Sequence, residues 1–197
     1  MTGILAIMMA VILTNNFVLS QFLGICPFLG VSKKLDSAAG MGMAVTFVML
    51  IATAVTWPIQ VLILDKYGIG YLQTLVFILV IASLVQLVEM ILKKYMPPLY
   101  KSLGVFLPLI TTNCSVLGVT IMNITEGYNY IEALFCSIGA GLGFLLAMIL
   151  FASLREKLES CKGIPACFQG IPITLITASI LSMSFMAFSG VVDGIFG

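Results

Sequence analysis

CPFLGV at Cys26–Val31 is matched by CSVLGV at Cys114–Val119, and both stretches read C-x-x-L-G-V. A second pair follows in the same order, with AGMG at Ala39–Gly42 and AGLG at Ala140–Gly143. The repeated order indicates two related halves, each with one cysteine at the matching position. A single packed cysteine is common in any helix, but a cysteine repeated in a matched context favours a shared metal or redox centre.

Composition predicts an all-α integral membrane protein. Of the 197 residues, 61% are hydrophobic and only 9% are charged, whereas a soluble domain carries about 25% charged residues. Six charge-free runs each reach the ~20 apolar residues that cross a bilayer core. These runs are Met1–Ser32, Ser37–Leu64, Tyr67–Val88, Ser102–Thr125, Ala133–Leu154 and Gly163–Val192. We therefore expect one domain over 1–197 with six transmembrane helices. The first run has no basic segment before it, so we do not expect a cleaved signal peptide.

The basic residues predict the orientation of these helices. The segments after helices 1, 3 and 5 hold eight of the nine Lys and Arg residues: Lys33, Lys34, Lys93, Lys94, Lys101, Arg155, Lys157 and Lys162. Only Lys66 lies on the other face. The positive-inside rule then places loops 1–2, 3–4 and 5–6 in the cytoplasm and both termini outside the bacterial cell membrane.

Three helices in each half make the two halves inverted repeats, at about 1–95 and about 96–197. Inverted repeats commonly place a functional site near the midplane, on interrupted helices. Helices 1 and 4 are predicted to be interrupted, because Gly24, Pro27 and Gly30 weaken the first and Pro108 and Gly118 the second. Polar residues lie beside both breaks, where they either serve an ion path or make hydrogen bonds between helices. They are Asn15, Asn16, Gln21, Thr111, Thr112 and Asn113.

The two matched cysteines are predicted to be buried at membrane depth. A rise of about 1.5 Å per residue places Cys26 roughly 10 Å and Cys114 roughly 20 Å from the nearest cytoplasmic lysine. An iron–sulfur cluster commonly takes four Cys thiolates, and structural zinc also takes four ligands. The chain has no histidine, so these motifs supply two ligands. Any cluster at Cys26 and Cys114 then needs two more ligands from another chain.

The other titratable residues are expected to be structural. Cys136 is predicted to be a small packed residue, and Cys161 and Cys167 have no recognised metal spacing in a cytoplasmic loop. Glu89 is an intramembrane acid, but Lys93 follows at i+4 and favours an ion pair over an ion path. The glycines of the AGxG motifs are expected to allow close helix contact rather than phosphate binding.

The chain resembles the RnfA family, and the closely similar NqrE subunit shares much of the same pattern. The resemblance rests on NNFVL from Asn15, GICPFLGVSKKL from Gly24 and LPLITTNCSVLGV from Leu107, and it spans essentially the whole chain. It implies a six-helix subunit of a complex that transfers electrons between ferredoxin and NAD⁺ and moves Na⁺ or H⁺. An NqrE-type subunit of a Na⁺-pumping NADH:quinone reductase is the alternative.

The resemblance also implies the cofactor and the partners. Cys26 and Cys114 are implied to hold half of a [2Fe–2S] cluster, with the other two cysteines on a paralogous RnfE-like subunit of opposite topology. Flavins, NAD and further Fe–S clusters are implied only on other subunits (RnfB-, RnfC-, RnfD- and RnfG-like). The chain is thus expected to be part of a redox-driven translocase, with no complete active site of its own and no nucleic-acid partner.

Three other classes of protein share some of these features. A secondary transporter also has inverted repeats, but it usually needs more intramembrane charge and no matched cysteines. A thiol–disulfide enzyme would use Cys26 and Cys114 as a redox pair, but the predicted outside loops hold no cysteine for exchange. A structural scaffold leaves the repeated cysteines without a role.

Overall fold

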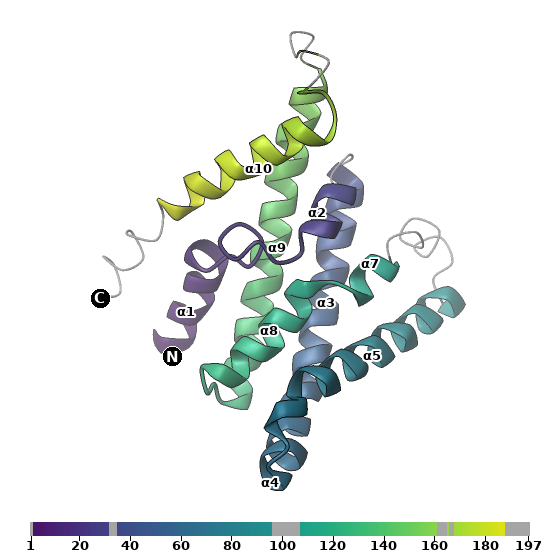
Figure 1. Cartoon of the computed structure of the whole chain (residues 1–197), viewed down its shortest axis with the longest axis vertical. Helices are drawn as coiled ribbons and strands as arrows, with labels where there is room; N and C mark the ends of the chain where they lie inside the picture. Colours follow the sequence, from purple (N-terminus) through teal and green to yellow (C-terminus); the bar gives the residue numbers. More distant parts are fainter. Residues whose placement is uncertain (1, 32–34, 96–106, 161–164, 166–167, 188–197) are drawn as a thin grey trace.

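The structure is a computed structural model that describes residues 2–31, 35–95, 107–160, 165 and 168–187, and every regular element among them is a helix (Figure 1). The elements are α1 Thr2–Met9, η1 Ala10–Thr14, α2 Ile25–Val31, α3 Leu35–Ile59, η2 Gln60–Leu64, α4 Asp65–Tyr67, η3 Gly70–Leu72, α5 Gln73–Tyr95, α7 Leu107–Thr111, α8 Cys114–Thr125, α9 Tyr130–Glu159 and α10 Ile171–Met186. The predicted all-α architecture is confirmed for these residues.

Two long helices, α3 and α9, form the centre of the molecule (Figure 1). A Cβ at Gly42 would clash with the Leu145 side chain, and one at Gly141 would lie 2.8 Å from the Cα of Thr46. Gly42 on α3 therefore contacts Leu145 on α9, and Thr46 contacts Gly141. Because the residue numbers increase along α3 while those of their contacts on α9 decrease, the two helices are antiparallel. The AGxG glycines act as predicted, because they let the two backbones approach closely.

The first helix packs on the other side of α9. A Cβ at Gly139 would lie 3.3 Å from the Cα of Met8, and one at Gly143 would lie 3.3 Å from the Cα of Ile12. This helix forms the rest of the core together with α8, which also contacts α3 and α9, and with residues of α5 and α7. The large, fully buried residues of the core are Phe17, Leu19, Met41, Val45, Met49, Phe77, Val85, Ile110, Phe144, Met148 and Phe151.

The chain is non-helical next to both predicted interruptions, although Pro27, Gly30, Pro108 and Gly118 themselves lie within helices. The first helix ends at Thr14 and α2 begins at Ile25, while Thr112 and Asn113 separate α7 from α8. Phe22 and Gly24 have φ values of +56° and +82° within the first break. A bulky residue with positive φ is a real outlier, so tertiary packing, and not local preference, holds this segment.

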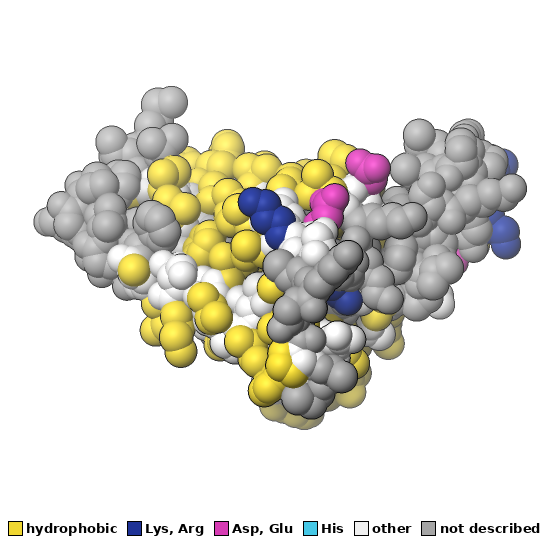
Figure 2. Space-filling model, turned by 90° about the horizontal axis from the view of Figure 1, so that it is seen from above, with side chains coloured by type: hydrophobic (Ala, Val, Ile, Leu, Met, Phe, Trp, Pro, Cys, Tyr) yellow, Lys and Arg dark blue, Asp and Glu magenta, His cyan; other side chains and the backbone are white. Residues whose placement is uncertain are grey.

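The described helices suit a membrane. Three of them are long and apolar enough to cross a bilayer, at Leu35–Tyr67, Gly70–Ile91 and Tyr130–Leu158. Shorter apolar helices lie at Leu109–Thr125 and Ile171–Met186. Hydrophobic side chains cover much of the described surface in Figure 2. On α5 and α10 the exposed ones include Leu75, Leu79, Met90, Ile171, Ile180 and Met183. The chain is thus membrane-embedded, and the count of six spans stays a prediction.

Candidate functional site

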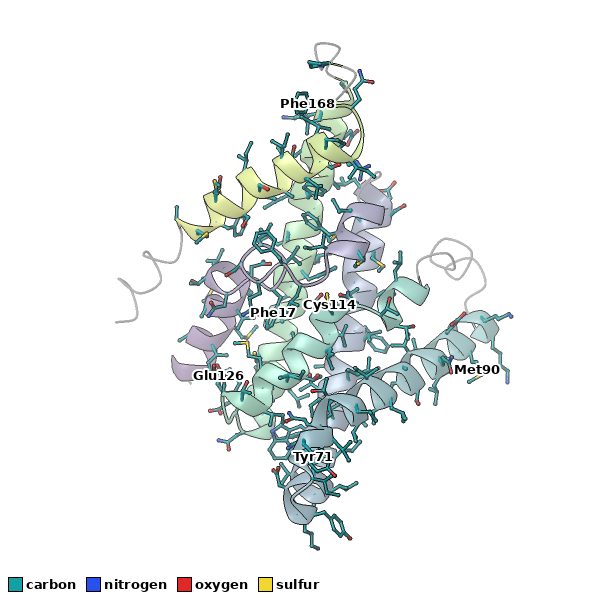
Figure 3. The ribbon with its side chains drawn as sticks, in the orientation of Figure 1. Phe17, Tyr71, Met90, Cys114, Glu126 and Phe168 are labelled. Carbon is teal, nitrogen blue, oxygen red and sulfur yellow. The ribbon has the colours of Figure 1, made fainter. Side chains whose placement is uncertain are left out.

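Each of the two matched cysteines lies at the start of a helix that follows a break. Cys26 is the second residue of α2 and Cys114 is the first residue of α8. Figure 3 shows Cys114 near the middle of the molecule. Both thiols are free and exposed, so the prediction that they are buried is wrong for the single chain. The reason is that each cysteine points away from the core while its neighbours Pro27 and Ser115 pack inward.

A hydrogen bond joins the two cysteine segments. The backbone N–H of Gly24 donates to the Sγ of Cys114 at 2.9 Å. Gly24 lies two residues before Cys26, so their Cα atoms are at most about 7 Å apart. Cys114 therefore lies beside the chain segment that carries Cys26. Hydrogen bonds to cysteine sulfurs are among the features that set the reduction potential of iron–sulfur clusters.

Only glycine fits at position 24. A Cβ there would clash with the Oγ of Ser115 and would lie 3.0 Å from both the Oδ1 of Asn113 and the Cε2 of Phe144. The φ of +82° adds a second requirement for glycine. Because Gly24 has no side chain, the first break packs directly against the N-terminus of α8.

Asn113 fixes the start of α8. Its Oδ1 accepts hydrogen bonds from the backbone N–H of Ser115 at 3.1 Å and from the Ser115 hydroxyl at 2.6 Å. This is N-capping, which satisfies a helix N–H that has no partner within the helix. The Nδ2 of Asn113 is buried and donates to no described residue. A buried donor without an acceptor is costly, and this one belongs to the residue next to Cys114.

Asn16 organises the first break. Its Nδ2 donates to the carbonyls of Ile12 at 3.1 Å and Gly143 at 2.9 Å. Its Oδ1 accepts from the N–H groups of Val18 at 3.1 Å and Leu19 at 3.4 Å. Asn16 therefore replaces helical hydrogen bonds that the break removes and ties the break to α9. Non-helical backbone at membrane depth needs such protein partners.

The turn that carries Cys26 is also held by α9. Arg155 donates from Nη1 to the Leu29 carbonyl at 2.8 Å, where a cation suits the C-terminal end of α2. Phe28 and Phe151 stack with ring centroids 4.1 Å apart. The Cys26 thiol is thus presented at the surface by a backbone that is fixed on its inner side.

The donor set fits half of an iron–sulfur ligand shell. Two exposed thiols and a backbone N–H that already donates to one of the sulfurs are groups that such a cluster uses. Within the described ranges, no group of three or more His, Cys, Asp or Glu residues could hold a metal. The described residues offer two exposed thiols, at Cys26 and Cys114, where a cluster takes four ligands.

Other residues that the sequence singled out lie away from this site or outside the described residues. Cys136 is fully buried in α9 and is a packing residue as predicted. Cys161 and Cys167 lie outside the described residues. Glu89 is half-buried in α5, four residues before the exposed Lys93; their ion pair stays a prediction. Asn15, Gln21 and Thr112 are exposed, and Thr111 is half-buried.

Sequence reasoning named Asn16 and Asn113 only as general polar residues and gave Gly24 no role beyond weakening a helix. Asn113 could have been found, because Asn directly before a helical run is an N-cap signal. Gly24 and Asn16 carried no such signal, since their partners lie 90 and 127 residues away.

Comparisons with known proteins agree on one family. A family model described as Rnf-Nqr subunit, membrane protein, matches residues 4–192. The chain is 56% identical over 194 residues to the A subunit of the ion-translocating oxidoreductase complex of Syntrophotalea carbinolica, covering 98% of this chain and 100% of that protein. It is 59% identical over 184 residues to the A subunit of the Na⁺-translocating ferredoxin:NAD⁺ oxidoreductase complex of Acetobacterium woodii, covering 93% and 95%.

A third relative shows the same likeness over nearly the whole chain. The chain is 50% identical over 192 residues to the A subunit of the ion-translocating oxidoreductase complex of Vibrio cholerae, covering 98% of this chain and 99% of that protein. The matches run almost the full length of both proteins and include both cysteine segments. The chain belongs to the Rnf-Nqr family of membrane subunits.

Proposed function

We propose that the chain is the RnfA subunit of an ion-translocating ferredoxin:NAD⁺ oxidoreductase complex in the cell membrane. In this role it carries electrons within the membrane by holding half of a [2Fe–2S] cluster through Cys26 and Cys114. The names of the three relatives favour this over an NqrE-type subunit, since each is the A subunit of an ion-translocating or ferredoxin:NAD⁺ oxidoreductase complex. They also favour an oxidoreductase over a secondary transporter.

The observation that carries the proposal is the hydrogen bond from Gly24 to Cys114. It brings together two cysteine segments that the sequence repeats, and each of the two thiols is exposed. Exposed thiols in an otherwise apolar surface suit a ligand set that a second chain completes. The paralogous RnfE-like subunit is the proposed source of the two remaining thiolates.

When bound, the cluster would accept and pass on one electron at a time. The chain's own residues hold and tune that site. Cys26 and Cys114 supply thiolates, and the Gly24 N–H stabilises negative charge on the Cys114 sulfur. Asn113 and Asn16 keep the two breaks in place, and Phe28 with Phe151 covers the inner side of the Cys26 turn.

The proposed architecture is two inverted three-helix repeats with termini outside. The antiparallel packing of α3 and α9, which carry the matched AGxG motifs, supports the inversion. Arg155 and Lys157 lie at the end of α9 beside the start of α3, opposite Lys66 on α4 (Figure 1). This separation supports a cytoplasmic face at the C-terminal end of α9.

The test is electron paramagnetic resonance of the reduced, assembled complex. Cys26→Ala and Cys114→Ala should each remove one cluster signal and stop ferredoxin-driven ion transport, because each removes a thiolate ligand. Cys136→Ala is the matched control and should keep both, as should the double Cys161→Ala and Cys167→Ala variant.

All variants must be compared at equal amounts of assembled complex, because a misfolded chain would mimic a lost ligand. An assembled Cys114→Ala complex with the full cluster signal and a normal transport rate would contradict the proposal.

A further inference from the structure

Helix α5 packs on the rest of the chain through one face only. In the apolar part of its span 17% of the residues are buried, against 39% and 56% in the other two long spans. Phe77, Ile81 and Val85 are buried, and because they follow at i, i+4 and i+8 they form a single face. In Figure 1 the C-terminal part of α5 runs away from α3 and α9. The described residues therefore leave the other side of this helix uncovered.

The uncovered side of α5 carries polar groups. Leu79, Ser83, Gln86 and Met90 follow at i, i+4, i+7 and i+11, so they share a face, and all four are exposed. The Ser83 hydroxyl donates to the Leu79 carbonyl of its own helix at 2.9 Å. The side-chain amide of Gln86, by contrast, makes no hydrogen bond to a described residue.

Gln86 lies within the membrane span and not at its end. Along the axis it is about 20 Å from Gln73, the first residue of α5, and about 10 Å from Lys93 in the last turn. The three long spans hold three amide side chains, Gln60, Gln73 and Gln86, and only that of Gln86 is exposed. Hydrocarbon offers an amide no hydrogen bond, so an amide that faces lipid is costly. The Gln86 amide thus needs a protein partner that the described residues do not supply.

We propose that the α5 face formed by Leu79, Ser83, Gln86 and Met90 binds a transmembrane helix of another subunit of the complex, which presents a hydroxyl or amide side chain to Gln86. Glutamine side chains hydrogen-bond between helices in membranes, and a small residue such as Ser83 lets a second helix approach closely. Leu79 and Met90 are 62% and 66% exposed and supply apolar contacts on either side of the amide.

This contact is separate from the one at the cysteines. Figure 3 shows Met90 near the far end of α5, away from Cys114. The inference rests on the proposed function, which supplies other membrane subunits, and it adds a second place where the chain meets one of them. Membership of such a complex favours another subunit over a second copy of this chain. Lipid tails fit poorly, because they have neither a donor nor an acceptor for the amide.

The first test is Gln86→Leu in the complete complex, purified through a tag on this chain. Leucine keeps an apolar side chain of similar length and removes the amide. Loss of one interhelical hydrogen bond should lower the recovery of one other membrane subunit in detergent about threefold to tenfold. Thermal unfolding of the isolated chain should not weaken, because Gln86 bonds to none of its described residues.

The second test adds bulk to the same face and identifies its occupant. Ser83→Phe should lower the recovery of the same subunit. Ser153→Phe is the matched control, because Ser153 is also exposed on a spanning helix and its hydroxyl also donates to a carbonyl of its own helix, that of Ile149. A p-benzoylphenylalanine at position 90, illuminated in intact membranes, should give an adduct with that subunit.

Unchanged recovery in both Gln86→Leu and Ser83→Phe would overturn the inference. So would an adduct at position 90 with lipid alone or with a second copy of this chain alone. Failure of the cysteine proposal is seen separately, as a cluster signal that survives in Cys26→Ala or Cys114→Ala, and it does not alter the recovery or the adduct.

Discussion

The backbone N–H of Gly24 donates to the Sγ of Cys114 at 2.9 Å, across 90 residues of sequence. The donor belongs to one half of the chain and the sulfur to the other. Each of the two repeated segments therefore depends on the other for its position. A substitution in either break should therefore alter the positions of both cysteines.

Gly24→Ala should destabilise the chain and lower cluster occupancy in the assembled complex. Its φ of +82° costs an L-residue about 1–2 kcal/mol, and the new Cβ would also clash with Ser115. Gly127→Ala is the matched control, because Gly127 has a φ of +67° but open space around its Cβ position. Thermal unfolding in detergent and the cluster signal measure the two effects. Equal losses in both variants would show that crowding at Gly24 contributes nothing.

Asn16→Ala should destabilise the fold by about 2 kcal/mol or more. The change leaves the Gly143 carbonyl and two backbone N–H groups of the break without their partner, and an unpaired buried group costs about 1–3 kcal/mol. Asn15→Ala, at the exposed neighbouring position, should cost less than about 0.5 kcal/mol. Chemical denaturation in detergent compares them, and similar losses would argue against the role assigned to Asn16.

The sequence predicted the helical class and the membrane environment, which follow from composition and charge spacing. It placed the breaks less well, because Gly24 lies in the first break while Pro27 and Gly118 lie inside α2 and α8. It also predicted the close helix contacts of the AGxG glycines, because small residues at helical spacing have few other uses in a membrane.

The partners of the polar side chains could not be read from the sequence. Thr53, Asn123 and Ser137 look like ordinary polar residues in apolar helices, and only the packing of α3, α8 and α9 brings their side chains into hydrogen-bond contact. Exposure of the two thiols was also missed, because hydropathy reports membrane depth and does not tell a lipid-facing or partner-facing position from a core position.

Phe22→Gly should stabilise the isolated chain and weaken its assembly with the partner subunits. Phe22 has a φ of +56° and is 54% exposed, four residues before Cys26. Glycine relieves about 1–2 kcal/mol of backbone strain but removes an exposed aromatic side chain, the kind that often anchors interfaces. Thermal unfolding of the isolated chain and its co-purification with the complex measure the two parts. Unchanged co-purification would show that Phe22 does not face a partner.

The chain purified alone should hold little or no stable [2Fe–2S] cluster. It offers Cys26 and Cys114 to a cluster that takes four ligands, and co-expression with the paralogous membrane subunit should restore the cluster. Iron and sulfide analysis, with the visible spectrum, measures occupancy. Stoichiometric iron and sulfide in the monomer would contradict a shared site, and so would a homodimer that holds the cluster without the partner.

Labelling from outside the cell should reach Tyr67→Cys and not Glu156→Cys. Tyr67 ends α4 and is 71% exposed, while Glu156 lies exposed between the basic residues at the end of α9. The eight-to-one division of Lys and Arg predicts that the first position faces outward and the second faces the cytoplasm. A membrane-impermeant maleimide on intact cells should therefore label the first variant, and the second only after the membrane is opened. The reverse pattern would invert the predicted orientation of the helices.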